Sequence, residues 1–161
     1  MINLGERCVN FGLPRLLAGY NSYSQIVQAP GYVTIMAEMA HDARVIPVGS
    51  RAHLDKSVRS WNGDSIARWE GDTLVIESTS FNDSTWLGRG GFMHTADMKI
   101  VERLTRVGNE LRYDMTVQDP MFVEPWVVPT RILRAGAANV VPERRDCEVY
   151  EEGEFVTQLR H

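Results

Sequence analysis

Lysine is almost absent from this sequence, since Lys56 and Lys99 are the only lysines among 17 basic residues. The positive charge therefore belongs to arginine, whose planar guanidinium suits paired contacts with carboxylates. No cluster of basic residues occurs, and the net charge is −4, so the chain lacks the basic face that phosphate binding needs. These shortages argue against a nucleic-acid partner and favour arginine–carboxylate pairs inside or beside a site.

Long apolar runs and a leader peptide are missing as well. No stretch approaches the roughly 20 apolar residues of a membrane span, so no membrane partner is expected. No basic, hydrophobic, small-residue signal peptide opens the chain. Cys8 and Cys147 lie near opposite ends without metal-type spacing, which argues against a zinc pair. They predict either two buried thiols or a disulfide that closes a long loop.

Several catalytic signatures are also lacking. Ser65 and Ser78 have no surrounding Gly-x-Ser-x-Gly elbow, and neither cysteine lies in a nucleophile context, which disfavours covalent catalysis. The glycine-rich segment 88–91 lacks the lysine of a phosphate-binding loop. We therefore expect no cofactor.

The sequence does contain short strands separated by glycine turns. Alternating apolar residues and turn residues predict strands at 25–28, 32–41, 65–69, 73–81, 98–107, 111–117, 125–134 and 147–150. Helical periodicity is nearly absent. The pattern predicts one mainly β domain over 1–161, an antiparallel meander that forms a small barrel or a strongly curved sheet of lipocalin-like or calycin-like kind, with little helix. Residues 1–24 are expected to be an irregular lead-in, and 47–60 and 82–97 to be long loops of a binding site.

His41 and Glu102 are the main catalytic candidates. His41 alternates in phase with Val33 and Ile35, so it should point to the apolar side of its strand, where an imidazole can act as a general base. Glu102 is in phase with apolar residues of another strand and would be the acid, with Asp42 as an alternative acid or orienting group. The competing interpretations are a buried histidine bonded to a carbonyl, and a Glu102 paired by Arg44, Arg68 or Arg103.

Further residues are candidates for substrate binding. The arginines would hold an anionic or oxyanionic centre, and the aromatic residues would line a cavity unless they pack in the core. The full set is Arg44, Arg59, Arg68, Trp61, Trp69, Tyr113, His53 and His94. His41, His53 and His94 would form a metal site only if three strands or loops brought them together, and their spacing gives no metal signature. Asp64, Glu70 and Asp72 flank a hairpin and could bind calcium. Turn chemistry is the simpler explanation, because Asp and Gly are favoured at such bends.

The joint pattern of several segments resembles a family of bacterial proteins. The segments include Glu38-Met39, His41-Asp42-Ala43-Arg44, Gly63-Asp64-Ser65, Arg68-Trp69-Glu70-Gly71-Asp72-Thr73-Leu74-Val75, His94-Thr95 and Glu102-Arg103, within about residues 5 to 126. Members are uncharacterised, mostly environmental and often exported. The resemblance implies no reaction, because no activity is established for the family. It implies a periplasmic or secreted location, favours the disulfide, and suggests a domain trimmed from a longer chain.

Three functions are compatible with these features. The leading hypothesis is an acid/base isomerase, lyase or hydrolase that binds a small molecule, such as a sugar or polyol, in a β-barrel cavity. The second is a non-catalytic, lipocalin-like carrier of a small ligand. The third is a metal-dependent site on His41, His53 and His94. The sequence leaves the oligomeric state open, with a homodimer among the options.

Overall fold

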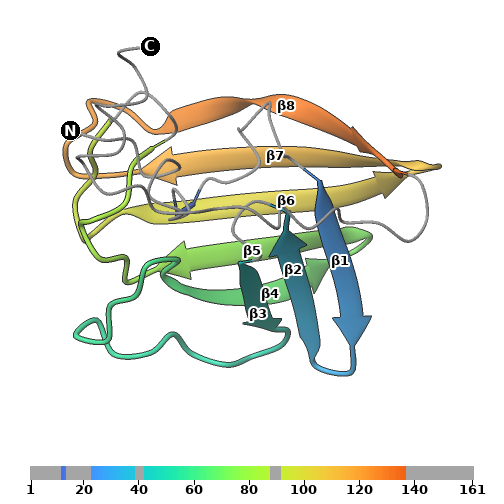
Figure 1. Cartoon of the computed structure of the whole chain (residues 1–161), viewed down its shortest axis with the longest axis horizontal. Coiled ribbons are helices and arrows are strands. Elements are labelled where there is room, and N and C mark those ends of the chain that lie inside the picture. Colours follow the sequence, from blue (N-terminus) through green and yellow to red (C-terminus); the bar gives the residue numbers. More distant parts are fainter. Residues whose placement is uncertain (1–11, 14–22, 39–41, 88–91, 137–161) are drawn as a thin grey trace, which may run out of the picture.

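The larger of two sheets is a five-stranded antiparallel meander. The computed structural model describes residues 12–13, 23–38, 42–87 and 92–136. The strands follow one another in the order β4-β5-β6-β7-β8 (Figure 1). They are β4 (Asp64–Glu70), β5 (Thr73–Thr79), β6 (Lys99–Val107), β7 (Glu110–Gln118) and β8 (Trp126–Arg134). Tight turns at Gly71 and Gly108, both with positive φ, allow each strand to pair with the next.

The smaller sheet has three strands in the order β1-β2-β3. They are β1 (Ser24–Ala29), β2 (Tyr32–Ala37) and β3 (Ala43–Pro47). The Pro30-Gly31 pair makes the β1–β2 turn, and Gly31 has a φ of 78°, which most other residues resist. In Figure 1 the strands of this sheet cross those of the larger sheet steeply.

The two sheets meet through a shared core and one backbone link. Val33, Ile35 and Ile46 of the small sheet belong to the same buried cluster as Ile76 and Leu104 of the large one. Just past β3, Val48 forms a parallel bridge with Ala67 of β4. The link holds the middle of β4 beside the residue that follows β3, so the two strands run side by side in parallel.

The prediction of a mainly β, antiparallel meander is confirmed, and the described residues contain no helix. The described strands do not close into a barrel, because β1 pairs with β2 alone and β8 with β7 alone. The five strands predicted between 65 and 134 agree with β4 to β8 to within a few residues.

The prediction around residues 32–47 was wrong in part. Strand β2 ends at Ala37 instead of continuing to residue 41, because the Ala37 N–H donates to the Asp42 carbonyl and closes a turn. Strand β3 then begins at Ala43, where no strand was predicted. His41 lies outside the described residues, as do Cys8, Cys147 and the strand predicted at 147–150. Strand β1 begins at Ser24, inside the expected lead-in.

Candidate functional site

A buried ion pair crosses the interface between the two sheets. Arg44 lies on the inward face of β3 and Glu102 on the inward face of β6. The guanidinium donates to both carboxylate oxygens, from Nη1 to Oε2 at 2.7 Å and from Nη2 to Oε1 at 3.0 Å. The Tyr113 hydroxyl donates to Oε1 at 2.8 Å. Both oxygens of Glu102 therefore have partners inside the protein.

The electrostatics of this cluster are those of a stable, ionised pair. Burial by itself disfavours the charged guanidinium, but the Glu102 charge and its hydrogen bonds raise the pKa of Arg44 above its usual value. Burial, together with the adjacent Glu102 charge, raises the pKa of Tyr113 well above its usual range. These contacts favour the interpretation of Glu102 as a structural carboxylate paired by Arg44.

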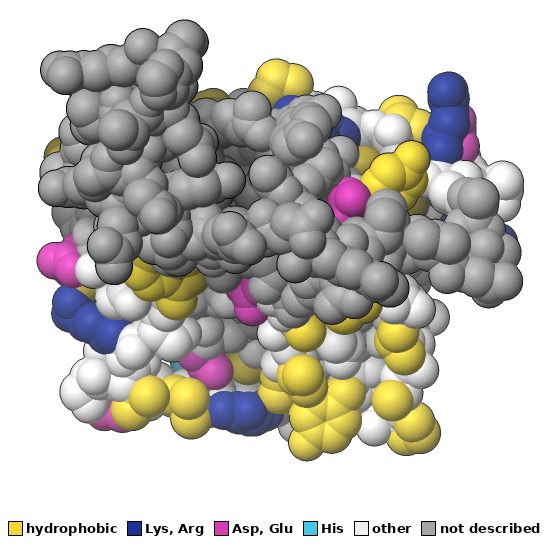
Figure 2. Space-filling view, in the orientation of Figure 1, with side chains coloured by type: hydrophobic (Ala, Val, Ile, Leu, Met, Phe, Trp, Pro, Cys, Tyr) yellow, Lys and Arg dark blue, Asp and Glu magenta, His cyan; other side chains and the backbone are white. Residues whose placement is uncertain are grey.

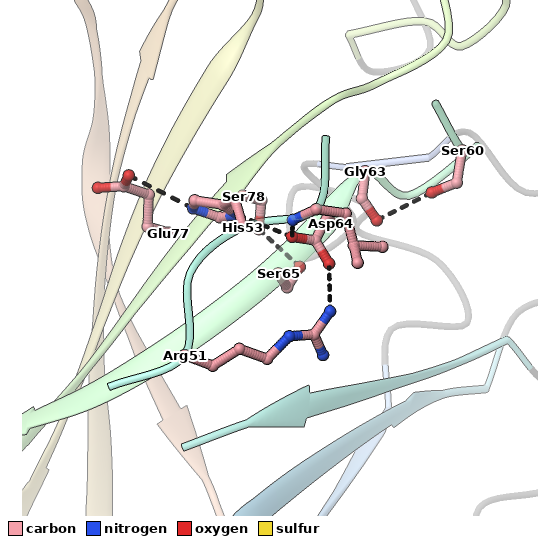
Figure 3. Close-up of polar contacts among 9 residues, drawn as sticks. Arg51, His53, Ser60, Gly63, Asp64, Ser65, Glu77 and Ser78 are labelled. Carbon is pink, nitrogen blue, oxygen red and sulfur yellow. Dashed lines mark hydrogen bonds and ion pairs between the residues drawn. The ribbon is translucent and has the colours of Figure 1, made fainter. Parts of the chain in front are cut away.

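A second charged cluster lies on the opposite face of the large sheet. Asp64 begins β4 and points away from the core, because the next residue, Ser65, is buried. Ile66 lies on the same face as Asp64 and pairs with Glu77 of β5, so Glu77 is on this face as well. The loop from Val48 to Gly63 returns across this face. It brings His53 between the two carboxylates, as Figure 3 shows.

The imidazole of His53 contacts one carboxylate at each ring nitrogen. Nδ1 lies 2.9 Å from Asp64 Oδ2, and because a carboxylate accepts, Nδ1–H is the donor. Nε2 lies 3.4 Å from Glu77 Oε1, but the orientation does not form a hydrogen bond. Among the described residues, Nε2 is the one buried side-chain nitrogen or oxygen without a hydrogen bond. This ring is therefore hydrogen-bonded to Asp64 on one side and faces Glu77 at a longer distance on the other.

Glycine fixes where Asp64 enters its strand. Gly63 has a φ of 68°, and a Cβ there would lie 2.5 Å from the Thr79 carbonyl oxygen and 2.8 Å from the Phe81 ring. Only glycine permits this approach. The Leu54 N–H donates to Asp64 Oδ2 at 3.0 Å, so the loop and the strand are tied together at the carboxylate.

Cations flank the two carboxylates on their outer sides. Lys99 Nζ lies 2.8 Å from Glu77 Oε2, and Arg51 Nη2 lies 3.7 Å from Asp64 Oδ1. The hydrogen bond from Lys99 lowers the pKa of Glu77 below its usual value, against the opposing effect of partial burial. The result is a row of alternating basic and acidic side chains that extends from β6 to the loop, in the order Lys99, Glu77, His53, Asp64 and Arg51.

A small polar pocket adjoins the Asp64 end of this row. Its volume is about 210 Å³. Its lining includes Arg51, Asn62 and Asp64, together with Arg44 and other residues of β3. Asn62 donates to Asp42 at 2.7 Å, which positions the amide at the pocket wall. His53 lies behind Asp64 and does not line the pocket.

A larger groove opens between the two sheets at the other end of the core. Its volume is about 770 Å³. Val33, Leu74 and Leu104 are buried residues of its lining, and Ile26 and Trp69 remain exposed there. Arg106 and Leu111 lie where this groove meets a second depression of about 540 Å³ beside β8.

The other predicted site residues are scattered. Arg59 donates to the Lys56 carbonyl, and Arg68 pairs with Glu70 at the surface. Trp61 is half-buried, whereas Trp69 is 50% exposed and lines the groove instead of the polar pocket. Asp42 bonds to Asn62 at the pocket wall, and Tyr113 is in the core. Arg59 and Arg68, which the sequence predicts to bind substrate, line none of the three concave sites described above.

His94 has internal partners at both ring nitrogens. Nδ1 donates to the Thr95 carbonyl at 2.8 Å, and Nε2 accepts from the Thr85 hydroxyl. His94 and His53 thus contact different groups, and no cluster of three or more His, Cys, Asp or Glu side chains suited to a metal ion occurs in the described ranges. No helix among the described residues is long and apolar enough to cross a membrane.

Sequence reasoning missed the partners that define the polar cluster. Asp64 was explained by turn chemistry, and Arg51, Asn62, Glu77 and Lys99 were not singled out. The available signal was the alternation of Asp64 and Glu77 with buried residues on paired strands, which places both carboxylates on one face. Their contact with His53 depends on the path of the long loop, which no local pattern encodes.

Comparison with known proteins gave no relative for this chain: no protein-family model matches it, and neither a curated protein nor a solved structure does.

Proposed function

We propose that this chain is a small-molecule enzyme that performs acid/base chemistry at the polar pocket beside Asp64. The observation that carries the proposal is the partly buried His53 ring, bonded to Asp64 through Nδ1 and lacking a hydrogen bond at Nε2. A carboxylate that lines a pocket and is hydrogen-bonded to an imidazole behind it has the arrangement of a catalytic base and its orienting group. In this proposal Asp64 and His53 take the catalytic roles that the sequence predicts for His41 and Glu102.

The pocket lining favours a compact, polar substrate with an anionic group. A volume of about 210 Å³ is about seven times the share of one liquid water molecule. The Arg51 side chain is 44% exposed and sits 3.7 Å from Asp64, so a carboxylate on the substrate can reach its guanidinium. The Asn62 amide and the Asp64 carboxylate suit hydroxyl groups. A hydroxy acid or sugar acid has both features.

In this proposal Asp64 is the base and His53 is the group that orients it. His53 and Leu54 N–H both donate to Oδ2, which leaves Oδ1 on the side of Arg51. A proton moves from the bound substrate to Oδ1 while Arg51 holds the charge of the substrate. Isomerisation and elimination can each begin with this transfer, and hydrolysis begins with the same transfer from a water molecule; general base catalysis contributes about 10²- to 10⁴-fold to a rate.

Exchange of substrate protons with solvent deuterium tests the proposal without knowledge of the product. Glycerate and glucuronate are incubated with the protein in deuterated buffer, and loss of the proton beside the carboxylate is followed by NMR. We expect protein-dependent exchange that Asp64→Asn lowers by about 10²-fold or more. The control is Asp83→Asn, a change at an exposed loop carboxylate, which should exchange like the wild type. Exchange that is equal in both variants contradicts the role of Asp64.

The groove between the sheets supports a second candidate, a carrier of a small apolar ligand. Its size lies in the range of ligand sites, and its apolar lining includes a half-exposed indole at Trp69. The two sheets that bound the groove are linked by the bridge between Val48 and Ala67.

Dye binding separates this candidate from the first. If the groove binds apolar molecules, anilinonaphthalene sulfonate will fluoresce with the folded protein, and Trp69→Ala will weaken its binding about tenfold. Trp126→Ala is the matched control, because that indole is 38% exposed on β8 and does not line the groove. Equal binding by both variants removes support for the carrier.

A further inference from the structure

One backbone edge of strand β1 has no neighbouring strand in the part of the chain that the structure describes. The other edge pairs with β2 over all six residues, from Ser24 opposite Ala37 to Ala29 opposite Tyr32. Every residue of β1 after Ser24 is exposed. A free edge of this kind presents unpaired N–H and C=O groups to any extended chain that approaches it.

Strand β1 also lacks the features that keep edge strands apart. Its sequence, Ser-Gln-Ile-Val-Gln-Ala, contains no charge, no proline and no glycine. Strand β8, at the edge of the large sheet, has Pro129, Arg131 and Arg134, and its register with β7 is interrupted between Tyr113 and Met115. Proline, charge and irregular register all oppose edge pairing. The β1 and β8 edges are therefore unlike, and of these two β1 is the one suited to receive another strand.

The outer face of the small sheet is apolar next to this edge. Val27, Thr34 and Val45 lie opposite one another across the three strands. Val27 is 49% exposed and Val45 is 63% exposed. Hydrophobic side chains gather over the β1–β2 hairpin in the lower right of Figure 2. A strand added to β1 would extend this row of side chains and cover part of it.

We propose that β1 pairs antiparallel with β1 of a second copy of this chain. A two-fold axis perpendicular to the sheet joins the two small sheets into one continuous sheet and keeps their apolar faces on the same side. An interface of this symmetry must be compatible with itself. An uncharged strand meets this condition, because no register places like charges opposite each other. The pairing leaves the polar pocket uninvolved, since no residue of β1 lines it.

Sedimentation equilibrium of the purified chain tests the proposal, over about 1 to 300 μM. The wild type should show a reversible monomer–dimer equilibrium. Val27→Lys puts a charge on each copy near the axis and should weaken the dimer by about tenfold or more. Val127→Lys is the matched control, because Val127 is an exposed valine on the edge strand β8, and this variant should dimerise like the wild type.

Gln25→Glu provides a second variant of nearly unchanged size, in case Val27→Lys does not fold as judged by circular dichroism. It should also weaken the dimer. A wild type that stays monomeric at the highest concentration overturns the proposal. So does a dimer that persists in folded Val27→Lys or Gln25→Glu, or one that is lost equally in Val127→Lys.

Discussion

Two clusters of charged side chains in this protein are built from similar residues and differ in how completely they are satisfied. In the Arg44–Glu102 cluster, both carboxylate oxygens and both guanidinium ends are bonded, and the two side chains are at most 7% exposed. In the Asp64–His53 cluster, one imidazole nitrogen has no hydrogen bond and Arg51 is 44% exposed.

The difference indicates separate roles. The buried Glu102 carboxylate accepts hydrogen bonds at both oxygens, and its bidentate contact with Arg44 fixes the position of one sheet on the other. The second cluster lies beside a pocket that Asp64 lines, and its Arg51 cation is turned to solvent, so it retains capacity to bind a ligand. We therefore assign the first cluster to the fold and the second to the proposed function.

Loss of Glu102 should have the largest effect on stability. Glu102→Ala leaves the buried Arg44 charge without a partner, which should lower the free energy of unfolding by about 3–5 kcal/mol. Urea denaturation followed by circular dichroism measures the change. The double variant Arg44→Met with Glu102→Leu should lose less stability than Glu102→Ala, because no charge is stranded. A loss below about 1 kcal/mol for Glu102→Ala would show that this pair does not hold the sheets together.

Removal of the tyrosine hydroxyl should have a smaller effect on the same cluster. Tyr113→Phe keeps the buried ring but removes the hydrogen bond to Glu102 Oε1, and a bond to a charged group contributes about 1.5–3 kcal/mol. The same urea experiment measures the loss. Proton exchange of glycerate or glucuronate should be unchanged in the folded variant. A selective loss of that exchange would show that the Arg44–Glu102 cluster takes part in function, which would contradict its assignment to the fold alone.

The smallest effect is expected at Glu77, and it depends on pH. The folded pKa of Glu77 is lowered, chiefly by Lys99, so its stabilising contribution is present above the usual glutamate value of 4.5 and is lost as pH falls through the lowered folded value. Glu77→Gln should cost up to about 1 kcal/mol at neutral pH, since the pair is partly exposed. The difference from wild type should shrink as pH falls below 4.5.

Lys99→Met is the matched variant for this measurement, because it removes the cation that lowers the pKa of Glu77. Urea midpoints measured at several pH values should show the same loss of acid dependence in Lys99→Met and in Glu77→Gln. A constant difference between Glu77→Gln and wild type across the acidic range would contradict the assigned pairing.

Most of the strands follow from local patterns, because alternation and glycine turns determine them within short segments. The inward phase of Glu102 was predicted in the same way and is confirmed by its burial among Ile100 and Leu104. Its pairing with Arg44 instead of Arg68 or Arg103 depends on how the two sheets meet. That arrangement is a long-range property, and single-strand periodicity does not contain it.

The polar cluster shows the limit of local reasoning more clearly. His53 was a candidate, but its partners were not predicted, because they are 11 and 24 residues away in sequence, at Asp64 and Glu77. The loop brings them together only after β4 and β5 have paired. Asp64 follows Gly63, so it was assigned to turn construction, whereas the structure places it both at the start of a strand and at a pocket.

Chemical-shift mapping with glycerate and glucuronate tests the separation of the two clusters most directly. Labelled protein is titrated with each compound, and perturbed signals are located on the structure. The account predicts shifts at Arg51, Asn62, Asp64 and His53, with little change at Glu102 and Tyr113. Shifts centred on Glu102 and Tyr113, or on Trp69 in the groove with none at the polar pocket, would contradict it.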